Sequence, residues 1–231
     1  MDPALIEVRN LCYTYEDGTR ALDGIDFTLR AGETVALLGA NGSGKTTFVL
    51  HLNGLLVSGN SVSVCGLTVA KDTVAKVRRT VGVVFQDSDE QLFMPTVLDD
   101  VAFGPLNLLG NSADAVAAAR QALSLVGMAG HEQKAPYHLS AGEKRRVAIA
   151  GVLAMSPRIL VFDEPTTFLD PPGQRELLGI LRTLPQAKVI VTHDVQFARA
   201  IATRAAFFQK GRIVAEGGVD DVVAQFNWRA E

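Results

Sequence analysis

The sequence predicts an α/β fold with a mostly parallel core sheet, an N-terminal antiparallel β subdomain and an inserted helical lobe. Short continuous apolar runs at residues 35–38 and 159–162, and a similar segment at 188–192, are typical of parallel strands buried on both faces. Nearer the N-terminus, Ile25, Phe27 and Leu29 alternate with polar residues, as in a half-buried strand. An alanine-rich stretch in the middle of the chain indicates the helical lobe.

Length and composition favour one domain over residues 1–231, because 48% of the residues are hydrophobic and can form a sizeable core. The formal net charge of −3 gives no general attraction to nucleic acid or anionic lipid. Cys12 and Cys65 are far apart in the sequence, and we expect both to be reduced and buried. The apolar stretches are far shorter than a membrane span, so we expect any membrane association to be peripheral.

The elements follow in order along the chain. An extended segment from Ile6 to about residue 15 is followed by a turn and the alternating strand. The buried run at 34–38 leads into a glycine-rich loop and a helix, and residues 61–85 contain short strands around a basic helical turn. A helix capped by Ser112 and another after Ser140 belong to a lobe at approximately 95–157. Two buried strands separated by a helix at about 173–184, then a hairpin at 207–215, complete the domain.

The glycine-rich loop between strand and helix is the strongest functional signal. It has the pattern G-x-x-x-x-G-K-[ST], whose backbone N–H groups surround phosphate oxygens while the following helix adds its positive N-terminal dipole. Lys45 can reach the β- and γ-phosphates, and the Thr46 hydroxyl can ligate Mg²⁺. A simple connecting turn is the alternative, and the flanking elements disfavour it. The predicted nucleoside triphosphate site comprises Gly39, Ala40, Asn41, Gly42, Ser43, Gly44, Lys45, Thr46 and Thr47.

Two acidic residues, Asp163 and Glu164, follow the buried strand at 158–162. Open α/β sheets bind ligands at the carboxyl ends of their strands, where these acids lie. We expect Asp163 to hold Mg²⁺, directly or through water, and Glu164 to polarise the attacking water. Solvated acids at a strand end are the alternative. A nucleoside triphosphate and Mg²⁺ are therefore the expected ligands.

A short motif between these two phosphate motifs narrows the class of protein. Residues 139–143 resemble the L-S-G-G-Q signature of the ABC (ATP-binding cassette) superfamily, although Ala141 and Glu143 replace the usual glycine and glutamine. The resemblance covers essentially the whole chain and implies the P-loop NTPase fold of ABC ATPases, with ATP as the nucleotide and Mg²⁺ as its metal ion. It also implies that Ser140 and Gly142 form an anion cradle completing the nucleotide site of a second ABC ATPase chain, in a homodimer or a heterodimer.

Other family elements have counterparts in this sequence. Gln86 is similar to the Q-loop glutamine that contacts Mg²⁺ and the lytic water, and His193 is similar to the switch histidine that contacts the γ-phosphate. Residues 167–170 resemble the D-loop, in which Phe168 is bulkier than the usual small residue. Tyr15 is the first candidate for stacking on adenine and Tyr13 the second; packing in the sheet is the alternative for either.

A longer match, at residues 86–105 and 142–151, is similar to the ATPases of energy-coupling factor importers, which include the cobalt and nickel cassettes. It implies uptake of a transition metal ion, cobalt or nickel, or of a vitamin, by a complex in which this chain lies at the cytoplasmic face of the cell membrane. It further implies a transmembrane coupling subunit that docks near residues 86–105, and a cargo-binding membrane subunit. The chain ends soon after the hairpin, so we expect a weak nucleotide-free dimer.

A soluble ABC ATPase that acts on DNA or ribosomes is the alternative function. The segment between Gln86 and Leu139 is too short for the long coiled coils of DNA-organising relatives and lacks sustained heptads. Ribosome-acting relatives typically carry two cassettes in one chain, whereas this sequence contains one set of cassette motifs. The basic triplet at 144–146 is expected to be a solvated face or an interface contact rather than a nucleic-acid site.

Overall fold

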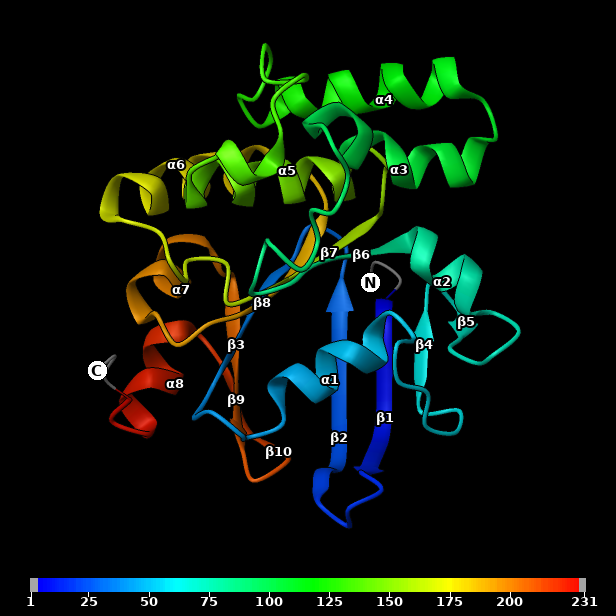
Figure 1. The fold of residues 1–231 in the computed structure, drawn as a ribbon. Coiled ribbons are helices and arrows are strands. Elements are labelled where there is room, and N and C mark those ends of the chain that lie inside the picture. The colour runs from blue at the N-terminus through cyan, green and yellow to red at the C-terminus, as the bar shows by residue number, and fades with distance from the viewer. Residues whose placement is uncertain (1–3, 229–231) are drawn as a thin grey trace.

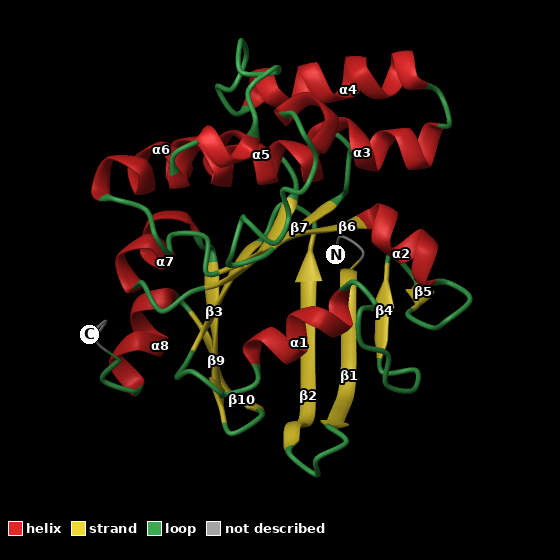
Figure 2. Ribbon diagram, in the orientation of Figure 1, coloured by secondary structure: helices red, strands yellow, loops and turns green. Residues whose placement is uncertain are grey.

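Two β-sheets and their helices make up the computed structural model, which describes residues 4–228 (Figures 1 and 2). The N-terminal sheet is antiparallel and has the strand order β2-β1-β4-β5. Its strands are β1 (Ala4–Thr14), β2 (Arg20–Arg30), β4 (Val62–Val64) and β5 (Leu67–Thr68). The predicted N-terminal antiparallel subdomain is therefore present.

The core sheet has the strand order β10-β9-β3-β8-β7-β6, in which only β10 runs antiparallel to its neighbour. Every residue of β3, β7 and β8 is buried, which explains their continuous apolar runs. The strands are β3 (Thr34–Leu38), β6 (Val81–Val84), β7 (Ile159–Asp163), β8 (Ala187–Val191), β9 (Arg204–Gln209) and β10 (Arg212–Gly217). The fold class predicted from the sequence is confirmed.

Helix α1 (Lys45–Leu52) packs against both sheets, and in Figure 1 it crosses in front of β1 and β2. Its Phe48, Val49 and Leu52 share one hydrophobic core with residues of β1 and β2 and with residues of β3, β7 and β8. The glycine-rich loop at residues 39–44 connects β3 to α1, so this packing fixes the loop at the carboxyl edge of the core sheet.

The helices between β6 and β7 form a separate layer (Figure 2). They are α3 (Val97–Leu109), α4 (Ser112–Leu125), the short 3-10 turn Pro136–His138 and α5 (Ala141–Leu153). A second hydrophobic core joins α3, α4 and α5 to β6, β7 and α6 (Pro171–Thr183). The remaining helices are α2 (Val74–Thr80), α7 (Val195–Ile201) and α8 (Val219–Gln225). Within residues 4–228, no helix combines the length and the apolar character needed to cross a membrane.

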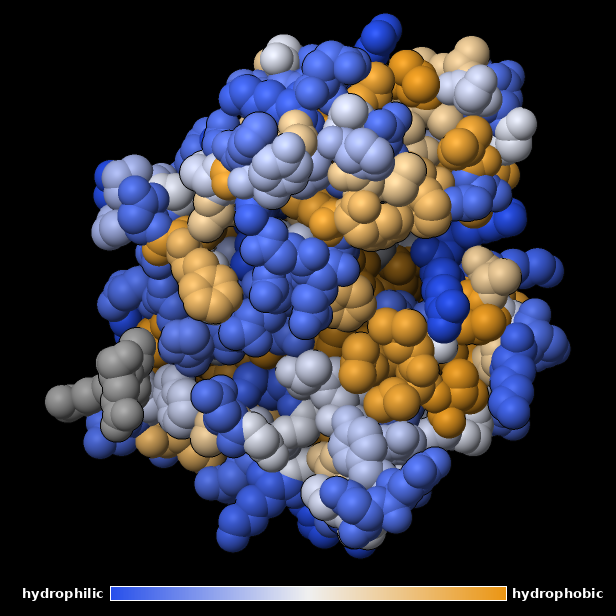
Figure 3. Space-filling model, in the orientation of Figure 1, coloured by the Kyte–Doolittle hydropathy of each residue, from blue (hydrophilic) through white to orange (hydrophobic). Residues whose placement is uncertain are grey.

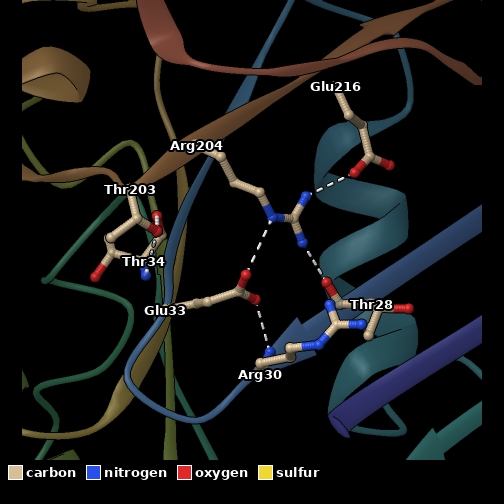
Figure 4. A network of polar contacts seen from close by, with 7 residues as sticks. All are labelled: Thr28, Arg30, Glu33, Thr34, Thr203, Arg204 and Glu216. Atoms are coloured by element: carbon tan, nitrogen blue, oxygen red, sulfur yellow. Dashed lines mark hydrogen bonds and ion pairs between the residues drawn. The ribbon is translucent and has the colours of Figure 1, made fainter. Parts of the chain in front are cut away.

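Arg204 on β9 ties the two sheets together (Figure 4). Its guanidinium donates to the backbone carbonyl of Thr28 on β2, and it forms ion pairs with Glu33 at 3.5 Å and with Glu216 on β10 at 2.6 Å. The same group lies 5.4 Å from the ring centroid of Phe27, within cation–π range. One side chain thus fixes the antiparallel sheet against the edge of the core sheet.

Several expectations from the sequence were wrong in detail. Cys12 and Cys65 are free but exposed, not buried: Cys12 lies on the outward side of β1, and Cys65 is in the β4–β5 turn with a φ of 49°. Helix α4 is capped by Asn111, whose side chain accepts from the N–H of Ala113, rather than by Ser112. Asn and Ser are both good caps, and adjacent candidates cannot be separated by residue type. Helices α7 and α8 were not predicted.

Candidate nucleotide site

The loop between β3 and α1 has a backbone that only glycine accommodates at two positions. Gly39 has a φ of 134° and Gly44 a φ of 107°, both in the region that side chains disfavour. A Cβ on Gly44 would lie 2.6 Å from the carbonyl oxygen of Ala21, and a Cβ on Gly39 would collide with the backbone of Phe208. The loop is therefore held close to β2 and β9, and α1 begins immediately afterwards at Lys45.

Lys45 is buried, and its ammonium donates to the carbonyl oxygens of Gly39 at 2.7 Å and Ala40 at 2.9 Å. Burial lowers the pKa of Lys45, whereas the carboxylates of Glu164 and Asp163 raise it. The ammonium thus lies inside the loop and near the two acids at the end of β7. This is the arrangement required of a cation that binds phosphate.

A cavity of about 300 Å³ opens at this loop. It brings together the glycine-rich loop, the end of β7, Gln86, which is the candidate Q-loop residue, and Tyr15, which is the candidate adenine-stacking residue. Its lining residues are Tyr15, Thr19, Arg20, Ala21, Asn41, Gly42, Gly44, Lys45, Thr46, Thr47, Gln86, Asp163, Glu164 and Val191. Gly39, Ala40 and Ser43 belong to the same loop but are not among these lining residues.

The two acids lie at the carboxyl end of β7, as predicted. Asp163 is the last residue of the strand, and Glu164 follows with a left-handed φ of 46°. Burial raises the pKa of Asp163, and the Thr46 hydroxyl and the Lys45 ammonium lower it. Burial also raises the pKa of Glu164, and His193 and Lys45 lower it. Two partly desolvated carboxylates beside a phosphate loop are typical of a catalytic site.

His193 lies two residues beyond β8 and contacts Glu164 directly. Its Nδ1 is 2.8 Å from Oε2 of Glu164, and its backbone N–H points to the same oxygen at 3.4 Å. Glu164 is buried, whereas the side chain of His193 is 54% exposed. The imidazole therefore holds the carboxylate with one edge and presents the remainder of its ring to solvent.

The donor set of this cavity fits Mg²⁺ together with a triphosphate. Thr46, Gln86 and Asp163 offer a hydroxyl, an amide and a carboxylate oxygen, which are the hard ligands that Mg²⁺ prefers. The hydroxyl of Ser43 is buried in the loop and has no hydrogen-bond partner within residues 4–228. Such an orphaned donor in a loop lined by N–H groups is suited to a phosphate oxygen.

The signature residues lie elsewhere, at the N-terminus of α5. The Ser140 hydroxyl accepts from the N–H of Glu143 at 3.3 Å, and the Glu143 carboxylate accepts from the N–H of Ser140 at 2.8 Å, forming a capping box. Glu143, which replaces the usual glutamine of the signature motif, therefore caps the N-terminus of α5. Ser140 and Gly142 are not among the residues that line the P-loop cavity of their own chain.

Arg145 is a residue of this region that the sequence did not indicate. It is buried, and its guanidinium donates to the carbonyl oxygens of Phe85 and Gln86, each at 2.6 Å. The basic triplet was expected to be solvated or to form an interface, but Lys144 pairs with Asp89 at 2.6 Å and Arg146 pairs with Glu176. The triplet thus fastens α5 to the segment after β6 and to α6.

Two aromatic predictions can be placed in space. Tyr15 lines the cavity, is 37% exposed and forms a hydrogen bond of 2.9 Å between its hydroxyl and that of Thr47. Tyr13 is half-buried against the core and is not among the lining residues. Phe168, in the segment resembling a D-loop, is 74% exposed and has a left-handed φ of 66°. An aromatic ring held out from the surface in this way is available to a partner.

Known proteins resemble this chain over nearly its whole length. A protein of Geobacter sulfurreducens that bears the name of an ABC transporter ATP-binding protein is 51% identical to this chain. The match covers 96% of this chain and 90% of that protein. The energy-coupling factor transporter ATP-binding protein EcfA of Methanothermobacter thermautotrophicus is 47% identical over 92% of this chain and 70% of that protein.

Solved structures of ATP-binding cassettes also resemble this chain over nearly its whole length. The structure of cbiO1 from Clostridium perfringens, part of the ABC transporter complex cbiONQ, has a TM-score of 0.87 and 34% identity over 97% of this chain and 92% of that one. The ATP-binding cassette MJ0796, a dimer in a post-hydrolysis state bound to ADP and Pi, has a TM-score of 0.81 and 27% identity over 93% of this chain and 98% of that one.

A glycine-rich phosphate loop and two strand-end acids around one cavity, with a histidine in contact with one of those acids, define a P-loop nucleoside triphosphatase. The ABC transporter family model matches residues 22–167. This chain therefore belongs to the ABC transporter ATP-binding family and is an ATP-hydrolysing transport ATPase. The alternative of an ATPase acting on DNA or ribosomes receives no support from these relatives.

Proposed function

We propose that this chain is the ATPase subunit of an energy-coupling factor importer, which drives the uptake of a transition metal ion, cobalt or nickel, or of a vitamin. One observation carries the proposal: the segment after β6 contributes to two cavities. Gln86 lines the nucleotide cavity, whereas Gln91, Leu92 and Phe93 line a separate cavity of about 350 Å³. The similarity to EcfA and to cbiO1 supports the importer class.

Within the nucleotide cavity, the backbone of the glycine-rich loop and Lys45 would bind the phosphates of ATP. Thr46, Asp163 and Gln86 would hold Mg²⁺, which neutralises phosphate charge when bound. Glu164 accepts a proton from the attacking water, since it is the carboxylate that His193 orients by the 2.8 Å contact. His193 contacts the γ-phosphate with its exposed part, and Tyr15 stacks on adenine.

A second ABC ATPase chain completes the site. Ser140 and Gly142 lie at the N-terminus of α5, which is an anion-binding position, but they do not line the cavity of their own chain. Two chains arranged head to tail would place this N-terminus over the partner's nucleotide, in a homodimer or a heterodimer. The dimeric state of the MJ0796 cassette supports this arrangement.

The second cavity is the proposed docking site of a transmembrane coupling subunit, near residues 86–105. It lies between the segment after β6, α3 and α5, and its floor and walls are largely apolar. Phe93 is 64% exposed and Phe103 43% exposed at this cavity. Figure 3 shows hydrophobic surface on both sides of the hollow between the helical lobe and the region of α1 and α2. Docking there would place the chain peripherally at the cytoplasmic face of the membrane.

Arg145 supplies the mechanical link between the two cavities. Its guanidinium holds the backbone of Phe85 and Gln86, and Arg145 itself lies on α5, the helix that begins at the signature. A partner that displaces the docking segment therefore acts on Gln86 and on α5 at once. Nucleotide binding and docking are coupled through one buried side chain.

The proposal is tested by affinity capture from membranes of the source cells, with the tagged Glu164→Gln chain in Mg-ATP. We expect recovery of a small transmembrane scaffold together with a cargo-binding membrane protein, whose identity would name the cargo. Phe93→Asp should lose both partners while ATP binding is kept. Leu125→Asp, an exposed position on α4 outside the cavity lining, is the matched control and should keep both partners. Recovery of ribosomes or DNA-bound proteins without a membrane partner would overturn the importer proposal and leave the ATPase.

A further inference from the structure

Behind the nucleotide cavity, four residues of β1, the loop after it and α1 contact one another in a closed circuit. The Tyr15 hydroxyl bonds the Thr47 hydroxyl at 2.9 Å, and the Thr47 carbonyl bonds Nδ1 of His51 at 2.8 Å. The His51 ring meets the Tyr13 ring edge to face, with centroids 4.8 Å apart and planes at 73°. Tyr13 in turn meets Tyr15 at 5.0 Å and 85°. Each ring is thus fixed by its neighbours, in the edge-to-face geometry that aromatic pairs prefer.

The circuit defines the state of His51. Its Nδ1 faces a carbonyl oxygen, so Nδ1 carries the hydrogen, and Nε2 is buried with no hydrogen-bond partner in the described part of the chain. Burial lowers the pKa of His51, and the bond to the Thr47 carbonyl raises it. A neutral, fully buried ring with one bonded nitrogen provides a rigid apolar face for Tyr13.

Only one ring of the circuit faces the cavity. Tyr15 and Thr47 line the cavity, whereas Tyr13 and His51 are not among its lining residues. Tyr15 lies just beyond the end of β1, where nothing in a strand ladder fixes its ring. The phenol end is held by Thr47, next to Thr46 in the phosphate loop, and the ring is held by Tyr13.

We propose that Tyr13 and His51 are positioning residues for Tyr15: they hold its ring in the orientation that receives the nucleotide base, and they set how much the base contributes to affinity. Tyr13 is thereby assigned the role of holding the Tyr15 ring, and it does not itself stack on the base. The inference rests on the proposed function, since it takes Tyr15 as the residue that packs on adenine. It adds two residues, neither of which touches the nucleotide, to the determinants of nucleotide affinity.

The test compares ATP with inorganic tripolyphosphate, which has the phosphates but no base, by equilibrium binding in Mg²⁺. Tyr13→Leu should weaken ATP binding by about three- to tenfold and leave tripolyphosphate binding unchanged. Tyr13→Phe retains the ring and should keep the wild-type ratio of the two affinities. His51→Gln retains a donor to Thr47 but lacks the ring, and should shift the ratio in the same direction as Tyr13→Leu. It also serves as the second variant if Tyr13→Leu does not fold.

A merely structural role gives a different result. The proposal would be overturned if Tyr13→Leu and His51→Gln weakened the binding of ATP and of tripolyphosphate equally, or weakened the binding of neither. In a Tyr15→Leu background, Tyr13→Leu should have no further effect on the ratio, because the two residues act as one unit; an additive loss would also overturn it. Binding of ATP by the wild-type chain, measured in the same experiment, tests the nucleotide site separately, so failure of the two ideas can be distinguished.

Discussion

The imidazole of His193 and the carboxylate of Glu164 form one unit, with Nδ1 2.8 Å from Oε2. Glu164 follows β7, and His193 follows β8, so parallel pairing of these strands brings the two residues together although they are far apart in the sequence. The His193 ring orients a buried carboxylate whose pKa is raised by burial and lowered by the ring itself. A carboxylate whose pKa is raised by burial is a stronger base than a solvated one, which is what water activation requires.

Glu164→Gln should nearly abolish ATP hydrolysis and preserve ATP binding. The amide keeps the shape of the side chain but cannot accept the proton, so kcat should fall by about 10²-fold or more. Turnover is measured by phosphate release and binding by equilibrium titration. Glu176→Gln, an equivalent change at an exposed carboxylate on α6, is the control and should have wild-type turnover. Wild-type turnover in the Glu164→Gln chain would show that another group activates the water.

The raised pKa of Glu164 also predicts a pH-dependent stability difference. Above its unfolded value of 4.5, the folded chain retains this proton more strongly than the unfolded chain, so the group lowers stability as pH rises through that window. Nucleotide-free Glu164→Gln should therefore have a higher Tm than wild type at about pH 8, and the difference should shrink as pH falls toward the unfolded pKa. Thermal unfolding across this pH range measures it, and a lower Tm for the variant at high pH would contradict it.

Gly44→Ala should abolish nucleotide binding. The added Cβ would lie 2.6 Å from the carbonyl oxygen of Ala21 at a φ of 107°, so the loop must move away from β2. Gly32→Ala is the matched control: its φ of 73° is also unfavourable, but a Cβ there meets no described atom within 4 Å, and Gly32 is not among the residues lining the nucleotide cavity. We expect the control to lose about 1–2 kcal/mol of stability and to keep ATP binding. Equal loss of ATP binding in both variants would show that close approach to β2 is not the reason for glycine.

The sequence predicted those parts of the fold and site that depend on local pattern. Buried parallel strands appear as short apolar runs, and a phosphate loop requires glycine and lysine at fixed spacing, so the sequence predicted β3, β7 and a glycine-rich loop between β3 and α1. Helices α7 and α8 have only seven residues each, which is too short for a clear helical period. They fold because Val195 and Val222 pack into the core beside β9.

Long-range polar contacts left no pattern in the sequence. Arg145 looks like one of three surface cations after a helix cap, and only the folded chain shows it buried against carbonyl oxygens of the segment after β6. Arg204 similarly has partners on three other parts of the chain. The sequence did not indicate a role for His51 either, because a single histidine in an apolar helix forms no recognisable motif. Such residues are found from geometry and not from spacing.

Arg145→Met should destabilise the chain and slow hydrolysis more than it weakens ATP binding. Its guanidinium is the donor to the carbonyl oxygens of Phe85 and Gln86, and removing a buried partner costs about 1–3 kcal/mol. In a domain of this size, each kcal/mol corresponds to a fall in Tm of roughly 2–4 °C. Arg145→Lys should recover only part of both losses, since one ammonium does not reproduce the planar fork. Full recovery by lysine would show that charge alone is required.

Mixing two inactive variants tests whether the signature serves the partner's nucleotide. Lys45→Ala removes the phosphate contact of one chain, and Ser140→Arg places a bulky side chain at the N-terminus of α5. In a head-to-tail dimer of the two variants, one site carries both defects and the other carries neither. The mixture should therefore recover roughly a quarter of the wild-type rate if half of the dimers are mixed and one intact site suffices.

Each variant alone should be inactive at any concentration, so the two separate variants are the controls for the mixture. The Ser140→Arg chain should still bind ATP as a monomer, because Ser140 is not among the residues lining its own cavity. If the signature acted on the nucleotide of its own chain, both chains would stay inactive in every combination. Absence of recovery in a mixture where differently tagged chains co-purify with ATP would therefore contradict the shared site, whereas recovery that grows with the concentration of the second chain requires it.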